Sequence, residues 1–378
     1  MSVPEKNSLP EEHPEHHPKQ STRHLRGILP FTRIGWRKIG LGLLSLVLFF
    51  TALELLKAGA REMASLTALL GRLDNPLNGL GLGWISSYLT LSGSPVAAIS
   101  LTLFDIQSIN QFTTFSMIVG SRLGGSLIVI FIGLLYLMQG HERGTSLLTG
   151  VITFLVTGLV YIPAAPLGLF LLGRIQVSSE LFDAWASGNL SLVERVFGPL
   201  TSLLLDLVPG WIIFGLGVGL TILSLNLIDK ALPEFELEEN VFGELPTLLY
   251  RPIISFLLGF GFTLLTMSVS ISLGLLVPLS VRGYIKRENL LPYIMGCNIS
   301  TFIDTVIAGL LLRNAAAANL VVVQIISVFA VSILILVFFY RKFQNLVLDA
   351  ALWLNAKNIR LTGFMVVLIL LPIVLILF

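Results

Sequence analysis

An apolar run at residues 258–272, LGFGFTLLTMSVSIS, carries four hydroxyl side chains within seven residues: Thr266, Ser268, Ser270 and Ser272. A helix that faces lipid gains nothing from so many hydroxyl groups, whereas backbone that lines a polar cavity at membrane depth can use them. The whole chain is 54% hydrophobic and 12% charged, against about 25% charged in soluble proteins. The run therefore predicts a polar break inside a multi-span membrane protein.

The same pattern occurs once earlier in the chain. Residues 82–96 align with 258–272 without gaps, at an offset of 176 residues. The matched polar, Gly and Pro residues are Pro76/Pro252, Gly83/Gly259, Thr90/Thr266, Ser92/Ser268, Ser94/Ser270 and Gly120/Gly296. These matches fall on the start of each stretch, on its polar break and on the span that follows. Two structural repeats are therefore expected.

Full membrane spans need about 20 apolar residues each. The candidates are 39–56, 115–139, 148–173, 200–228, 290–312, 319–340 and 361–378. Two further apolar stretches, 77–103 and 253–280, are interrupted by the Ser-rich breaks and are expected to be re-entrant helical hairpins. Three spans separate these hairpins, which gives the repeats opposite orientations. The expected fold is an all-α polytopic membrane protein with two inverted repeats, each with a re-entrant helical hairpin, and about seven full transmembrane helices. This architecture is typical of secondary transporters.

The charges fit an N-terminus in the cytoplasm and a multi-pass protein of the inner or plasma membrane. Most of the 24 Lys and Arg residues then lie on inner segments, as the positive-inside rule requires. The same census barely changes if both interrupted stretches cross the membrane, so turning back is favoured by the polar breaks alone. Gly215 and Gly219 form a small-xxx-small pair that indicates close helix packing.

The chain is expected to divide into five parts, with Trp353 as an interfacial anchor in the last of them. These parts are a disordered basic cytoplasmic tail (1–38), transmembrane repeat 1 (39–173), an outer loop with a linking helix (174–228), transmembrane repeat 2 (229–340), and an interfacial segment with the last transmembrane helix (341–378).

A second polar patch follows each hairpin. In repeat 2, Asn298, Ser300 and Thr301 offer neutral oxygen atoms that suit Na⁺. In repeat 1, Arg122 occupies the position equivalent to Asn298. A charge at this depth costs roughly 3 kcal/mol on insertion scales, so it needs a partner. Asp304, nearly two turns past Asn298, is the other charge at this depth. Arg122 is expected to contact an anionic substrate, Asp304, or both, and a purely structural Arg122–Asp304 pair is an equally open alternative.

The hairpin tips are the other candidate binding elements. Interrupted half-helices expose backbone N–H groups that suit an anion, and carbonyl and hydroxyl oxygens that suit Na⁺. The candidate substrate- and ion-binding residues are Thr90, Ser92, Ser94, Arg122, Thr266, Ser268, Ser270, Ser272, Asn298, Ser300, Thr301 and Asp304, with Na⁺ expected at Ser268, Ser270, Asn298 and Thr301. For any single hydroxyl, the alternative is a bond to its own helix or to a neighbouring helix. No motif combines a nucleophile with a base, so neither catalysis nor a cofactor beyond Na⁺ is expected.

The chain resembles the type II sodium-dependent phosphate symporters over residues 39–135 and 250–312. The resemblance rests on Asn-Pro-Leu at 75–77 before a Gly-rich hairpin, and on Gly-Cys-Asn-Ile-Ser-Thr at 296–301, which is similar to the family's Gly-x-Asn-Ile-Gly-Thr element. It implies inverted repeats with two hairpins whose tips bind phosphate and Na⁺. The chain departs from the family's Gln-Ser-Ser-Ser signature at Leu91 and Met267, which replace the glutamines, and carries Arg122 where the family has Asn.

The expected function is a secondary active transporter that moves a small inorganic anion, with phosphate the first candidate, coupled to Na⁺ by alternating access. One alternative is a carrier of the same fold with a different substrate or no Na⁺ coupling. Another is a non-transporting membrane scaffold or partner protein. The expected partners are phosphate or a similar anion, Na⁺ and the lipid bilayer, without nucleic acid, and a homodimer is left open.

Overall fold

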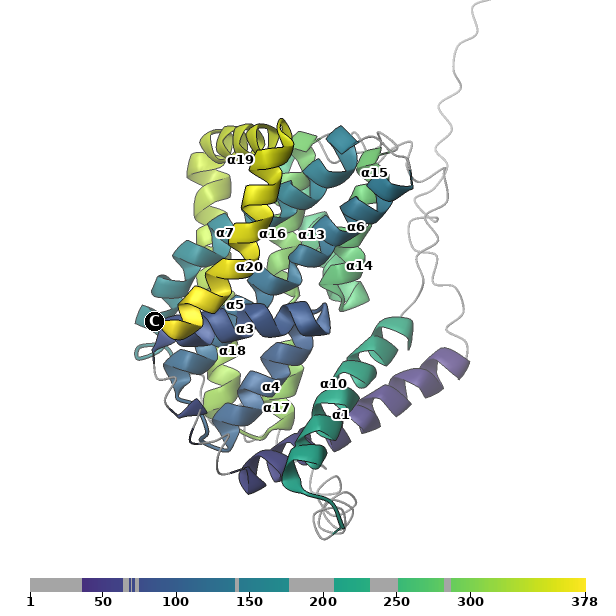
Figure 1. The fold of residues 1–378 in the computed structure, drawn as a ribbon, viewed down its shortest axis with the longest axis vertical. Coiled ribbons are helices and arrows are strands. Elements are labelled where there is room, and N and C mark those ends of the chain that lie inside the picture. Colours follow the sequence, from purple (N-terminus) through teal and green to yellow (C-terminus); the bar gives the residue numbers. More distant parts are fainter. Residues whose placement is uncertain are drawn as a thin grey trace, which may run out of the picture.

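The computed structural model describes residues 36–63, 68, 70–71, 75–139, 143–176, 207–231, 251–281 and 287–378 (Figure 1). Within these ranges the regular elements are all helices. Seven helical segments there are long and apolar enough to cross a membrane: Trp36–Glu62, Gln111–Met138, Ser146–Leu171, Gly210–Ile228, Arg287–Leu311, Ala315–Asn355 and Asn358–Leu377. The prediction of an all-α protein is confirmed for the described residues, as is the prediction of about seven helices long and apolar enough to span a membrane. Nearly all of the expected tail at 1–38 lies outside the described residues.

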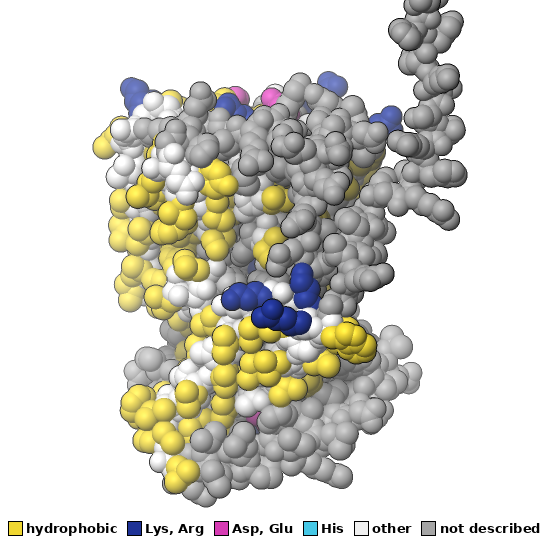
Figure 2. Space-filling model, turned by 90° about the vertical axis from the view of Figure 1, so that its right-hand side faces the viewer, with side chains coloured by type: hydrophobic (Ala, Val, Ile, Leu, Met, Phe, Trp, Pro, Cys, Tyr) yellow, Lys and Arg dark blue, Asp and Glu magenta, His cyan; other side chains and the backbone are white. Residues whose placement is uncertain are grey.

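The surfaces of the long helices indicate a lipid environment. Only 11% of the apolar window in Asn358–Leu377 and 22% of that in Gly210–Ile228 is buried inside the protein. Figure 2 shows hydrophobic side chains over much of the described surface, with Lys and Arg gathered at the upper end and in one group lower down. Soluble monomers rarely expose contiguous apolar areas of this extent, so the protein is embedded in a membrane.

Both predicted polar breaks interrupt helices. In the first half of the chain, α3 (Pro76–Thr90) ends at the break and α4 (Gly93–Asp105) begins after it. In the second half, α13 (Pro252–Thr266) is followed by α14 (Val269–Gly274) and α15 (Leu276–Val281). The bounds of α13 are those of α3 shifted by 176 residues, and the span of α14 and α15 together is that of α4 shifted by the same amount.

The backbone at the two breaks has the same conformation. Leu91 and Met267 are left-handed, with φ of 50° and 48°, and the serine after each is extended. The Thr90 hydroxyl donates a hydrogen bond to the Ser92 carbonyl at 2.7 Å, and Thr266 makes the equivalent bond at 3.3 Å. A left-handed residue without the freedom of glycine is uncommon, so its recurrence at equivalent positions indicates one structural motif used twice.

Glycines allow the helix before each break to pack closely on a later helix. In the first half of the chain, α3 packs on α5 (Gln111–Gly125), where a Cβ atom on Gly83 would overlap the Met117 carbonyl oxygen. In the second half, α13 packs on α16 (Arg287–Ser300), where a Cβ atom on Gly259 would overlap the equivalent carbonyl of Tyr293. In both pairs the helices run parallel.

The chain directions of the following helices are set by their contacts with α7 (Arg143–Leu171). α5 continues into α6 (Leu127–Met138), and α7 runs back along both, because Gly150 lies against Ile130 while Gly168 lies against Phe115. α5 and α6 are therefore antiparallel to α7.

The corresponding helices of the second half run the other way. α16 continues into α17 (Ile303–Leu311), and α18 (Ala315–Leu334) turns back beside them, with the Tyr340 hydroxyl donating to the Glu288 carbonyl at 3.1 Å. α18 begins where α7 ends, since the Asn319 side chain donates to the Ile175 carbonyl at 3.0 Å. α18 is thus antiparallel to α7, and α16 runs in the same direction as α7 and opposite to α5.

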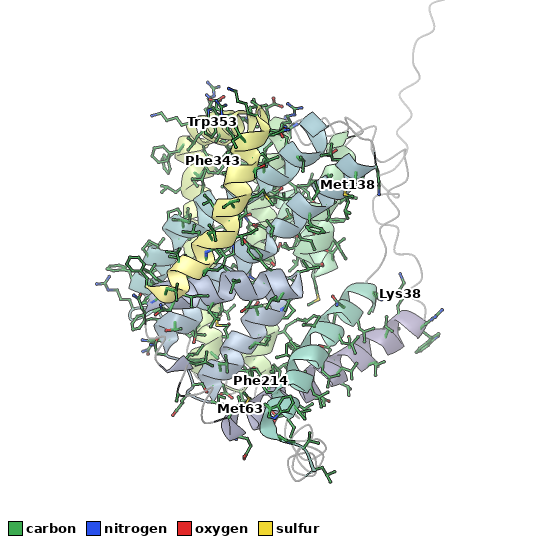
Figure 3. All side chains as sticks on the ribbon, in the orientation of Figure 1. Lys38, Met63, Met138, Phe214, Phe343 and Trp353 are labelled. Atoms are coloured by element: carbon green, nitrogen blue, oxygen red, sulfur yellow. The ribbon has the colours of Figure 1, made fainter. Side chains whose placement is uncertain are left out.

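A pair of antiparallel helices, α1 (Trp36–Glu62) and α10 (Gly210–Ala231), lies beside this core (Figure 1). Gly59 contacts the backbone of Phe214 (labelled in Figure 3), and Gly217 contacts Leu56. The predicted packing contact of Gly215 and Gly219 is not found among the described residues, where nothing lies within 4 Å of a Cβ atom on either glycine. Gly217, between them, faces α1 instead.

An ion pair fastens the α1–α10 pair to the core. Lys57 of α1 lies 2.9 Å from the carboxylate of Asp105 at the end of α4. Asp105 also accepts a hydrogen bond of 2.9 Å from the side chain of Asn314, which caps α18. The end of α1, the end of α4 and the turn between α17 and α18 therefore share one end of the molecule.

The C-terminal helices close the opposite end. After a π-helical turn (Ile335–Phe339), α19 (Tyr340–Asn355) lies across the top of the bundle in Figure 1. Its Phe343 is buried, whereas Trp353 is 57% exposed (both labelled in Figure 3). α20 (Asn358–Leu377) then descends along α3, where the Tyr88 hydroxyl donates to the Leu368 carbonyl at 2.9 Å. The first part of the expected interfacial segment is thus α19, an amphipathic helix with one buried and one exposed face.

Candidate functional site

The guanidinium of Arg122 on α5 lies at the centre of a buried polar cluster. Its Nη1 atom donates to the Thr301 hydroxyl at 3.2 Å and to the Ser94 hydroxyl at 3.4 Å. Its Nη2 atom donates to the Thr305 hydroxyl and lies 3.5 Å from Oδ1 of Asp304. Arg122 is only 7% exposed. Four of these five residues were predicted site residues, and they come from both halves of the chain.

Asp304 sits where α16 gives way to α17. Its carboxylate, on a residue that is 8% exposed, accepts a hydrogen bond of 2.8 Å from the Thr305 hydroxyl in addition to the Arg122 contact. The Phe302 ring lies under the guanidinium, 4.8 Å from the Arg122 Cζ atom. Burying two charges is costly unless they are paired and hydrogen-bonded, and this arrangement supplies both conditions. The expected contact between Arg122 and Asp304 is therefore present.

The N-terminus of α4 adds a second positive group beside Arg122. Ser92 is the N-cap residue of α4, but its side chain makes no capping hydrogen bond. A Cβ atom on Gly93 would lie 3.6 Å from the Cδ atom of Arg122, so the helix end and the arginine are neighbours. The N–H groups of a first helical turn carry partial positive charge and favour anions.

One donor of the arginine is unused. Among the described residues, the Nε atom of Arg122 is buried and has no hydrogen-bond partner. A buried donor without a partner costs on the order of 1–3 kcal/mol. Together with the uncapped start of α4, this atom makes the tip of the first hairpin able to receive an anion.

The tip of the second hairpin is satisfied internally. Ser268 caps α14, accepting from the Ile271 amide at 3.4 Å. The Thr266 and Ser272 hydroxyls lie 3.1 Å apart, and Ser272 also donates to the Ser268 carbonyl at 3.0 Å. The side chain of Ser270 lies outside the described residues. The two tips share a backbone conformation but differ in how their polar groups are used.

Asn298, the equivalent of Arg122 in the second half, is held by α7. Its side-chain amide donates to the Thr157 hydroxyl at 3.2 Å, and its backbone carbonyl accepts from the Tyr161 hydroxyl at 2.7 Å. The Tyr161 ring lies 6.1 Å from that of Phe302, so this group adjoins the arginine cluster. Ser300 bonds its own helix, donating to the Gly296 carbonyl at 3.3 Å.

Several residues of the site were not foreseen from the sequence. Thr305 and Phe302 flank Asp304, and their roles follow only from the bend between α16 and α17. Buried side chains with hydroxyl groups recur every four residues along α7, from Thr149 to Tyr161. This spacing is visible in the sequence and could have identified Thr157 and Tyr161. Gln324 of α18 is also fully buried, and neither polar atom of its amide has a partner in the described part of the chain.

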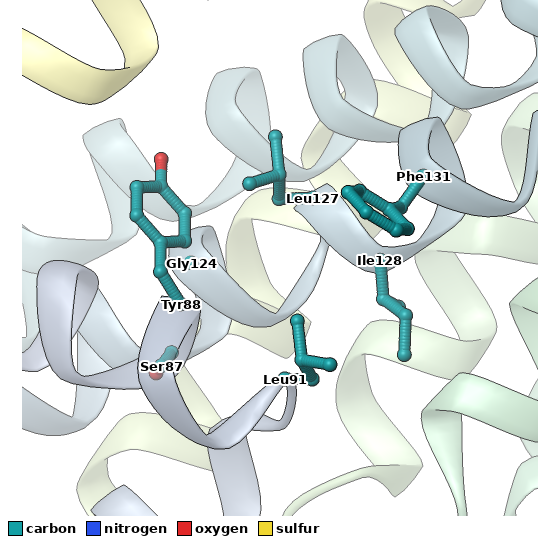
Figure 4. Close-up of a pocket in the computed structure, with 7 residues that line it drawn as sticks. All are labelled: Ser87, Tyr88, Leu91, Gly124, Leu127, Ile128 and Phe131. Atoms are coloured by element: carbon teal, nitrogen blue, oxygen red, sulfur yellow. The ribbon is translucent and has the colours of Figure 1, made fainter. Parts of the chain in front are cut away.

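A small, partly open pocket lies beside the break between α3 and α4, between α3 and the α5–α6 helices (Figure 4). Its lining residues are Ser87, Tyr88, Leu91, Gly124, Leu127, Ile128 and Phe131. The Ser87 and Tyr88 hydroxyls already donate to the carbonyls of Gly83 and Leu368. With an apolar lining and no free polar group, this pocket is not suited to an inorganic anion.

Comparisons with known protein families, with curated proteins and with solved structures find no match to this chain. The described residues also contain no group of three or more His, Cys, Asp or Glu side chains that could hold a metal ion.

Proposed function

We propose that the chain is a secondary active transporter for a small inorganic anion, with phosphate the first candidate and Na⁺ as the coupling ion. The observation that carries the proposal is the buried Arg122, with a free Nε donor, beside the uncapped N-terminus of α4. Two groups suited to an anion thus converge at an interrupted helix. The choice of phosphate and Na⁺ rests on the resemblance to the type II symporters.

The proposed architecture is a pair of inverted repeats with re-entrant hairpins. Its support is the 176-residue correspondence of helix bounds, together with the opposite directions of α5 and α16. The first hairpin ends at Asp105 of α4, which contacts Asn314 at one end of the molecule. The second hairpin leads into α16, which begins at the opposite end, where Tyr340 contacts Glu288. Rocking of one bundle against the other around the tips would then give alternating access.

The proposed location is the inner or plasma membrane, with the N-terminus in the cytoplasm. The support is the basic residues at the end formed by α19 and the starts of α13, α16 and α20, namely Arg251, Arg287, Arg341, Lys342, Lys357 and Arg360. In Figure 3, Met138 and Trp353 lie at this end and Met63 lies at the other. A basic end of this kind faces the cytoplasm in most membrane proteins.

A carrier of the same fold with another substrate is the second candidate. Leu91, which stands where the phosphate symporters have glutamine, is 55% exposed and lines the apolar pocket of Figure 4. An apolar side chain at the tip removes an amide that would hydrogen-bond phosphate. The chain would therefore offer an anion fewer polar contacts than the phosphate symporters do, which favours a different substrate.

The direct test is uptake of labelled phosphate into proteoliposomes, with and without an inward Na⁺ gradient. We expect uptake that the Na⁺ gradient raises at least tenfold and that excess arsenate inhibits. Sulfate as competitor separates phosphate selectivity from general anion transport. Uptake without Na⁺ dependence would support the second candidate, and absence of uptake of any of these anions would leave a non-transporting scaffold.

A further inference from the structure

We infer that Asp304 is the coupling residue: an incoming anion takes over Arg122, and a monovalent cation takes over Asp304. The inference rests on the proposed transport function and adds the residue at which the two ions are linked. The cation is Na⁺ or a proton, since either one neutralises a buried carboxylate.

The geometry of the ion pair allows it to separate. A charge-assisted hydrogen bond between an arginine and a carboxylate spans about 2.7–2.9 Å. The Arg122 Nη2 atom lies 3.5 Å from Oδ1 of Asp304, and it donates instead to Thr305. The pair is therefore a single, long contact rather than a two-bond clamp.

Arg122 keeps its position without Asp304. Ser94 and Thr301 accept from Nη1, and the Phe302 ring supports the plane of the guanidinium. None of these three contacts involves the carboxylate. An anion can thus bind at the free Nε atom and the start of α4 while the arginine stays in place.

Charge balance then requires a cation. Arg122 and Asp304 together carry no net charge, so a bound monovalent anion would leave one uncompensated negative charge in a site less than a tenth exposed. An uncompensated buried ion costs several kcal/mol. One cation on the Asp304 carboxylate removes this cost, which makes anion and cation binding mutually dependent.

Among the described residues, few other charges lie near Asp304. Tyr161 of α7 adjoins the cluster through the Phe302 ring, and its hydroxyl donates to the Asn298 backbone carbonyl, so it adds no charge. The helices packed against Asp304 add little: α17 has no other charged residue, α18 has none, and α5 has only Arg122. The nearest carboxylate on α4 is Asp105, at its far end and paired with Lys57. Arg122 is thus the charged partner that these helices place beside Asp304.

The test compares two modes of transport in proteoliposomes: accumulation of labelled phosphate driven by a Na⁺ or a pH gradient, and exchange of phosphate at equal concentrations. In the wild type, the gradient that drives accumulation identifies the cation. We expect D304N to accumulate at least tenfold less than the wild type, with exchange that continues but no longer depends on Na⁺ or pH. D105N is the matched control, because it removes an ion-paired carboxylate outside the site, and it should keep the coupling.

A D304N variant that still accumulates phosphate would overturn the inference. So would a well-assembled D304N variant that loses exchange together with accumulation, because Asp304 would then only hold Arg122 in place. If D304N does not assemble, the wild type in weak buffer provides the test, at an acidic pH where free phosphate is already monovalent and takes up no proton of its own. Phosphate binding should then take up about one proton or raise the affinity for Na⁺, and an absence of both effects would overturn the inference. A wild type without any exchange would refute the proposed function itself.

Discussion

Replacing Arg122 with Asn is expected to abolish anion uptake while the protein still inserts into the membrane. The variant removes the guanidinium that lies beside the start of α4, together with its unused Nε donor. A hydrogen bond to a charged group contributes about 1.5–3 kcal/mol, so the loss of the Nε bond alone lowers uptake at least about tenfold. The measurement is initial phosphate uptake per inserted protein.

Stability must be separated from transport in this variant. R122N leaves the Asp304 carboxylate buried without its charge partner, which costs about 3–5 kcal/mol. The double variant R122N/D304N removes both charges and should recover most of that stability, but it should not recover uptake. Normal uptake by R122N would contradict the substrate role and leave the Arg122–Asp304 pair as a purely structural contact.

Gly259→Ala is expected to destabilise the protein strongly, whereas Gly261→Ala on the same helix is expected to have little effect. A Cβ atom on Gly259 would overlap the Tyr293 carbonyl, so α13 would have to move away from α16. Overpacking of this kind costs about 1–3 kcal/mol. A Cβ atom on Gly261 would meet nothing within 4 Å in the described part of the chain, and alanine there gains up to about 1 kcal/mol from helix propensity.

Thermal unfolding of the two variants in the same detergent measures this difference. The midpoint for Gly259→Ala should fall by several degrees relative to that for Gly261→Ala. Gly83→Ala should behave as Gly259→Ala does, because its Cβ atom would overlap the equivalent carbonyl of Met117. Equal midpoints for Gly259→Ala and Gly261→Ala would contradict the close α13–α16 packing.

The helices and their breaks were largely predictable from the sequence. Lipid selects for apolar length, so the spans follow from hydropathy alone. The breaks at Leu91 and Met267 follow from hydroxyl clusters that repeat with Pro76 and Pro252 at one offset. The 176-residue offset also predicted that α3 and α13 begin and end at equivalent residues.

The composition of the site was only partly predictable. Which hydroxyls face the arginine depends on the rotation of each helix, and a helix that is apolar all round has no polar face to define that rotation. Ser94 and Thr301 reach Arg122, whereas the Thr90 and Ser300 hydroxyls bond their own backbone or that of the neighbouring turn. The contact of α10 with α1 through Gly217, rather than through Gly215 and Gly219, was unpredictable for the same reason. The sequence does not define which face of this apolar helix packs against α1.

Sidedness of labelling at the ends of the two interrupted helices tests the inverted hairpins most directly. Single cysteines are placed at Asn75, Gln107, Arg251 and Glu288 in a protein whose only native cysteine, the buried Cys297, is replaced by Ser. An impermeant thiol reagent is then applied to vesicles of known orientation. We predict that positions 75 and 107 react from the outside and that positions 251 and 288 react from the inside. Reaction of the two ends of either hairpin from opposite sides would contradict the re-entrant arrangement and, with it, the proposed meeting of the tips at Arg122.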